Sequence, residues 1–163
     1  TDDSVERKYL INYFLDQFRG TMYRQTMFAE FEMLTHDIVN QGGVLTAEQL
    51  CELYLTLNKK YFGDEMVSDP EIAYEWARIP HFYTPFYVYQ YATGFAAAIA
   101  ISSKILKGEE GIVEKYRQFL SGGSSMDPID LLKLCGVDMS SARPVEEALD
   151  VFEEYLSELE KGI

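Results

Sequence analysis

Apolar side chains recur every three or four residues along the first forty residues of this chain. The series runs Val5, Tyr9, Ile11, Phe14, Leu15, Phe18, Met22, Phe28, Phe31, Leu34 and Ile38. This spacing is typical of one face of an amphipathic α-helix and differs from the alternation of a half-buried strand. Asp3 with Glu6 gives a start for the helix, and Gly42-Gly43 gives the first break. One helix of this length favours an all-α fold.

The rest of the sequence continues the helical pattern. Thr46 and Gln49 stand at the positions of a capping box, so a second helix is predicted from Thr46 to about Tyr61. Further helices are predicted over residues 71–76, 86–106, 111–120, 128–135 and 144–161, between stretches of Gly, Ser and Pro. No segment has a convincing strand pattern. We therefore predict one all-α domain, a helical bundle over residues 1–163.

Charge and composition limit the kinds of partner and the cellular location that we expect for this protein. The formal net charge of −13 disfavours binding to nucleic acid or to an anionic membrane surface. The longest apolar run, residues 95–101, is too short to span a membrane, and residues 1–6 lack the features of a signal peptide. Cys51 and Cys135 are not arranged as a disulfide framework or a CxxC pair. We expect a cytoplasmic protein with two reduced thiols.

A proline-bounded loop carries one of only two histidines and leads into a tyrosine-rich helix start. Of the eleven residues His81 to Tyr91, six are aromatic and four are tyrosines. A helix start exposes unpaired N–H groups, and imidazole and phenol donors beside it suit a substrate carbonyl or a developing oxyanion. The alternative is a core histidine packed among aromatic rings.

Local signatures of a complete catalytic centre are missing from the sequence. His36 has no second histidine three to five residues away, so a self-contained zinc site is not expected. The segment 121–125 does not lead from a strand into a helix, as a nucleophile elbow requires. Donors at His81 can stabilise a reaction but cannot begin one.

Polar residues interrupt the first helix. Arg19, Arg24, Gln25 and Glu30 fall on more than one face of it. A buried arginine must be paired, so an internal network of ion pairs and hydrogen bonds is the simpler interpretation. Contact with a substrate is the alternative.

Several long segments resemble the C-terminal part of the oligoendopeptidase F family, zinc metallopeptidases related to thimet oligopeptidase. The matching segments are Phe-Arg-Gly-Thr at 18–21, Arg-Gln-Thr-Met-Phe-Ala-Glu-Phe-Glu at 24–32, Glu-Trp-Ala-Arg-Ile-Pro-His-Phe-Tyr at 75–83, Phe-Tyr-Val-Tyr-Gln-Tyr-Ala-Thr-Gly at 86–94 and Leu-Leu-Lys-Leu-Cys-Gly-Val-Asp-Met at 131–139. Their order and spacing are also similar. The resemblance covers essentially the whole chain.

This resemblance implies an all-α subdomain of a zincin-like metallopeptidase that hydrolyses short peptides. In the family an HExxH helix and a later glutamate hold the zinc, and this sequence contains neither. The zinc ligands are therefore expected in the missing N-terminal part of the same enzyme, and the chain alone is expected to be inactive. The resemblance implies catalytic roles for His81 and Tyr89, substrate binding by Tyr83 and Tyr87, and no metal ligand in this chain.

Two other readings stay open at this point. One is a zinc-free helical module that binds peptides or another protein through the aromatic groove. The other is a purely structural bundle in which the tyrosines are core residues. If part of an enzyme is missing, apolar faces become exposed, and a homodimer through those faces is a further hypothesis.

Overall fold

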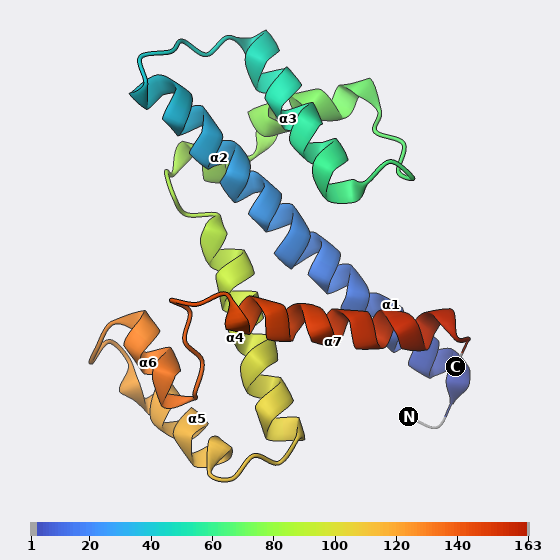
Figure 1. The fold of residues 1–163 in the computed structure, drawn as a ribbon, viewed down its shortest axis with the longest axis vertical. Coiled ribbons are helices and arrows are strands. Elements are labelled where there is room, and N and C mark those ends of the chain that lie inside the picture. The colour runs from blue at the N-terminus through green and yellow to red at the C-terminus, as the bar shows by residue number, and fades with distance from the viewer. Residues whose placement is uncertain (1–2, 163) are drawn as a thin grey trace. The chain divides into compact units, whose positions relative to one another are not determined.

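The computed structural model describes residues 3–162, which form helices, turns and loops and no β-strand (Figure 1). The α-helices are α1 (Ser4–Gln17), α2 (Arg24–Asn40), α3 (Ala47–Phe62), α4 (Tyr89–Leu106), α5 (Ile112–Gly122), α6 (Pro128–Leu134) and α7 (Arg143–Glu160). The predicted all-α fold is confirmed. The described residues group into two compact units, one of residues 3–18 with 93–162 and one of residues 19–92. The single domain expected over residues 1–163 stays a prediction.

The long first helix begins where the sequence predicts. The Asp3 carboxylate accepts hydrogen bonds from the amides of Val5 at 2.8 Å and Glu6 at 3.1 Å, which satisfies two of the free donors of the first turn. Between α1 and α2 the chain forms a π-helix, η1 (Phe18–Tyr23), which the sequence did not predict. Such wider turns are rare and often occur at functional sites.

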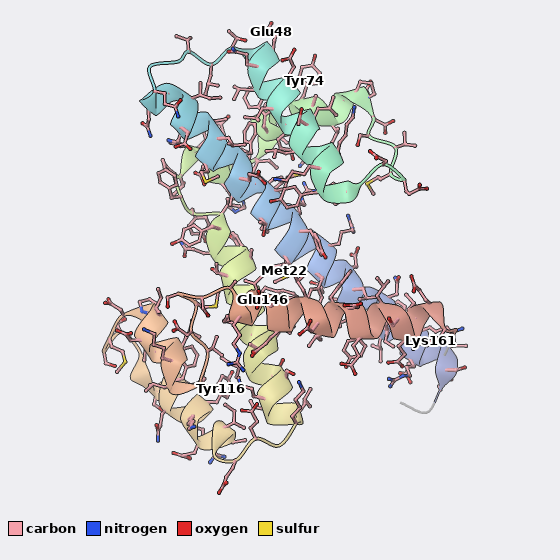
Figure 2. All side chains as sticks on the ribbon, in the orientation of Figure 1. Met22, Glu48, Tyr74, Tyr116, Glu146 and Lys161 are labelled. Atoms are coloured by element: carbon pink, nitrogen blue, oxygen red, sulfur yellow. The ribbon has the colours of Figure 1, made fainter. Side chains whose placement is uncertain are left out.

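The first unit has a core of small and branched side chains. The buried cluster comprises Ala97, Ala100, Ile101, Ile112, Cys135 and Val137, from α4, the start of α5 and the segment after α6. Tyr116 of α5, labelled in Figure 2, packs against this cluster. Burial raises the pKa of the Cys135 thiol, so that thiol stays protonated at neutral pH. None of the helices within residues 3–162 is long and apolar enough to cross a membrane.

The second unit also contains two 3₁₀-helices, η2 (Pro70–Arg78) and η3 (Pro80–Tyr83). Helix α3 packs against α2 and against η2, and η3 packs on α2 through Phe82. The buried cluster of this unit comprises Met27, Phe28, Phe31, Tyr54, Leu57, Ile79 and Val88. The predicted capping box of α3 is present, because Gln49 N donates to Thr46 Oγ1 and Thr46 N donates to Gln49 Oε1. Gly63 ends α3 with a φ of 76°, a conformation that a residue with a Cβ rarely adopts.

The start of α4 differs from the sequence prediction. A helix from residue 86 was predicted, but α4 begins at Tyr89. The physical reason is Phe86, whose φ of 56° lies in the left-handed region and cannot begin an α-helix. The Phe86 amide donates to Glu32 Oε1 at 2.7 Å, and its ring lies 4.8 Å from that of His36. Contacts with α2 thus stabilise a backbone conformation that is unfavourable by itself.

Replacing Glu30 with glutamine should weaken the second unit in a pH-dependent way. Glu30 accepts from Lys60 Nζ at 2.6 Å and Tyr61 Oη at 2.7 Å, and these bonds lower its pKa from the ordinary 4.5. The stabilisation is therefore present above about pH 4.5 and is lost as the pH falls through the lower, folded-state pKa. We expect a loss of under about 1 kcal/mol at pH 7, because Lys60 is largely exposed. Urea unfolding at pH 7 and pH 3.5 measures the loss of stability in Glu30→Gln, with Glu52→Gln as control. An equal loss at both pH values would contradict a stabilising role for the charged Glu30 carboxylate.

Candidate active site

His81 lies at the centre of a small aromatic cluster. Its half-buried imidazole stacks on the ring of Tyr87, with centroids 5.7 Å apart and planes 14° apart. Tyr91 packs edge-on to both rings, at 5.3 Å from His81 and 5.6 Å from Tyr87. We refer to His81, Tyr87 and Tyr91 as the aromatic cluster. It joins η3 to the beginning of α4.

Hydrogen bonds also connect the three side chains. Tyr91 Oη lies 3.3 Å from His81 Nε2, and it donates to Tyr87 Oη, also at 3.3 Å. The bond with Tyr87 raises the pKa of the Tyr91 phenol, which therefore keeps its proton at neutral pH. When the imidazole carries its hydrogen on Nε2, the donors run in one direction, from His81 to Tyr91 to Tyr87. The Tyr87 hydroxyl hydrogen then remains available to an external acceptor.

The loop that carries the cluster is anchored to the second unit's core. Phe82 of η3 packs against Phe28 at 5.5 Å and Phe31 at 5.1 Å, both on α2. Val88 is completely buried at the other end of the loop. Together with the bond from Phe86 to Glu32, these contacts hold the loop on α2. The donors of the cluster are consequently held before any ligand arrives.

The structure brings together only part of the predicted site. His81 and Tyr87 are in contact, whereas Tyr83 is 77% exposed and its hydroxyl donates to the carbonyl of Ala77 at 3.3 Å. Tyr89 follows Tyr87 by two residues, about 200° around a helix, and is half exposed. Sequence reasoning missed Tyr91. The four-residue spacing from Tyr87 to Tyr91 was the available signal, because such pairs meet on one side of a helix.

The described residues do not fit a zinc site. No three His, Cys, Asp or Glu side chains within residues 3–162 lie close enough together to hold a metal ion. A catalytic zinc needs about three such ligands from the protein. The aromatic cluster offers hydrogen-bond donors, which suit a polar ligand.

A buried carboxylate organises the polar residues of the first long helix. Glu75 of η2 is 5% exposed, and its Oε1 accepts from Arg24 Nη2 at 2.5 Å and from Arg78 Nη2. Its Oε2 accepts from Tyr54 Oη at 2.6 Å. Burial, followed by this bond, raises the pKa of Tyr54. The predicted internal ion-pair network is confirmed for Arg24 and, through Lys60, for Glu30.

Residues 2–151 match Peptidase family M3, so this chain belongs to that family. The resemblance seen in the sequence is thereby confirmed.

Comparison with individual proteins and with a solved structure supports the same family. The chain is 56% identical over 160 residues to oligopeptidase PepF of Bacillus subtilis, covering 98% of this chain and 24% of that protein. It is 49% identical over 159 residues to the plasmid oligoendopeptidase F of Lactococcus lactis, covering 98% of this chain and 26% of that protein. The crystal structure of oligoendopeptidase-F from Enterococcus faecium superposes with a TM-score of 0.96 at 46% identity, covering 99% of this chain and 31% of that one. The chain thus spans about a quarter of the length of these curated relatives.

Proposed function

We propose that this chain is part of an oligopeptidase that hydrolyses short peptides. One observation carries the proposal, the match of 150 residues, 2–151, to a peptidase family. The names of the relatives, oligopeptidase and oligoendopeptidase, support short peptides as the substrate class. The zinc that the resemblance implies would be held by residues of the enzyme's N-terminal part, outside this chain.

The aromatic cluster would bind the peptide backbone and stabilise negative charge on the carbonyl oxygen under attack. His81 is the proposed catalytic donor, acting directly or through Tyr91 and Tyr87. When several hydrogen bonds in a row point the same way, they polarise one another, and the last donor becomes stronger. Tyr89 stays a proposed catalytic residue, and Tyr83 and Tyr87 stay proposed substrate-binding residues.

Activity should require both this chain and the rest of a longer peptidase. The experiment compares the 163-residue chain with a chimera in which it replaces the 56% identical segment of B. subtilis PepF. A quenched fluorescent peptide reports turnover with and without a chelator. We expect chelator-sensitive cleavage by the chimera and none by the chain alone, because the described residues lack a metal-binding group.

Each other outcome is informative. Chelator-sensitive turnover by the purified chain would show that it holds a complete site. A folded chimera without turnover would contradict the peptidase function of this segment. Saturable peptide binding by the chain, combined with an inactive folded chimera, would instead favour the zinc-free binding module.

A further inference from the structure

A second polar site lies in the same unit as the aromatic cluster, in a cleft that the catalytic proposal does not use. The cleft encloses about 530 Å³ beside α2, the end of α3 and η2. Three of the chain's six arginines line it, namely Arg19, Arg24 and Arg78. The carboxylates that line it are Asp69, Glu71 and Glu75, so the cleft is formally neutral in a chain of net charge −13. A formally neutral cleft repels an anion less than the rest of this acidic chain does.

The buried Glu75 positions two of these guanidinium groups without neutralising both. One carboxylate carries one negative charge, whereas Arg24 and Arg78 carry two positive charges. Both ion pairs use Nη2 of the arginine, and a guanidinium has five N–H donors in a fork that matches a carboxylate. Arg24 is further held over the ring of Phe28, at 5.0 Å from the centroid. The pair is therefore preorganised for one more carboxylate.

The other residues that line the cleft favour a ligand with an apolar group and a single negative charge. Met66, Val67 and Tyr74 line the cleft and expose 48%, 87% and 66% of their surface, and Figure 2 labels Tyr74 on η2. Exposed apolar side chains in a concave site suit an apolar ligand group. Asp69 and Glu71 repel a polyanion, such as a nucleic acid or a phosphorylated ligand, more strongly than they repel a single carboxylate. A single carboxylate attached to an apolar group fits all of these features.

We propose that this cleft binds the C-terminal carboxylate of a peptide whose last side chain is apolar. The choice of a peptide as ligand rests on the proposed function of the chain. Arg78 and Arg24 bind the carboxylate, and the apolar side chain packs against Met66, Val67 and Tyr74. The cleft thereby favours peptides with a free C-terminal carboxylate.

The test is a titration of the ¹⁵N-labelled 163-residue chain with N-acetyl-glycyl-phenylalanine and, separately, with its C-terminal amide. We expect the acid to shift the Arg24 and Arg78 side-chain resonances and to bind at least tenfold more tightly than the amide. Arg78→Gln should weaken binding of the acid at least fivefold, and Arg78→Lys less, because lysine keeps the charge but not the fork. Arg78 is 71% exposed, so these variants should fold.

Arg117→Gln is the matched control. Arg117 is 72% exposed and pairs with a glutamate three residues away, as Arg78 does, but it lies in the other unit. Arg117→Gln should leave the affinity for the peptide acid unchanged within twofold. Equal binding of acid and amide, no saturable binding, or equal loss in the two glutamine variants would overturn the proposal, as would acetate binding as tightly as the peptide acid. These measurements do not involve turnover, so their failure leaves the proposed peptidase function standing.

Discussion

Replacing His81 with alanine in the PepF chimera is expected to lower kcat/KM by about 10²- to 10³-fold, as loss of one oxyanion donor typically does. His81 Nε2 is hydrogen-bonded to Tyr91 Oη in the aromatic cluster, and the His81 ring stacks on Tyr87. Its removal takes away both a donor and the support of the Tyr87 ring. Steady-state kinetics on a quenched fluorescent peptide measures the change, and a loss in kcat with KM nearly constant would place the interaction in the transition state.

The chain's other histidine supplies the control. His36→Ala removes an imidazole that lies at a tilt against the ring of Phe86. In this variant kcat/KM should stay within about threefold, or under about 0.7 kcal/mol of transition-state stabilisation. A change of less than twofold in His81→Ala, with the protein folded, would rule out the proposed role of His81. Similar losses in both variants would indicate a structural effect on the loop.

Replacing Glu75 with alanine is expected to destabilise the chain by about 2 to 4 kcal/mol. The substitution leaves the buried Tyr54 hydroxyl and the Arg24 guanidinium without their shared acceptor. The loss falls below that of a fully buried pair because Arg78 is largely exposed and regains water. Urea unfolding followed by circular dichroism measures the free energy of unfolding.

Glu71→Ala is a suitable comparison for Glu75→Ala. Glu71 lies on the same 3₁₀-helix, η2, but is exposed, so its replacement should change the stability by less than about 0.5 kcal/mol. Glu75→Gln should fall between the two, because the amide still accepts from Tyr54 but lacks the charge. A loss below 1 kcal/mol in Glu75→Ala would mean that the two arginines are adequately solvated without it.

The helices were predictable because their signals are local. Spacing of apolar residues, the Asp3 cap and the Thr46–Gln49 capping box each act within a few residues of the helix that they specify. The late start of α4 was not predictable in this way. It follows from the conformation of Phe86, which is stabilised by Glu32, and nothing within a few residues of Phe86 indicates that partner.

The candidate site was predictable as a segment but not as an arrangement. The concentration of aromatic residues between His81 and Tyr91 indicated the loop in which the aromatic cluster lies. Which tyrosines meet the imidazole depends on where the helix begins, and predicting that start three residues early obscured the pairing of Tyr87 with Tyr91. Glu75, the ion-pair partner of Arg24, was likewise not predictable, because the two residues lie 51 positions apart in the sequence.

The hydrogen bond from Phe86 to Glu32 also bears on the order in which the chain assembles. It joins groups 54 residues apart, so the loop cannot adopt its final shape until α2 has formed and the intervening chain has closed around it. Contacts of such sequence separation form late, because the entropy of loop closure opposes them. The histidine loop should therefore be among the last segments to become protected from amide hydrogen exchange during refolding, well after α2 itself.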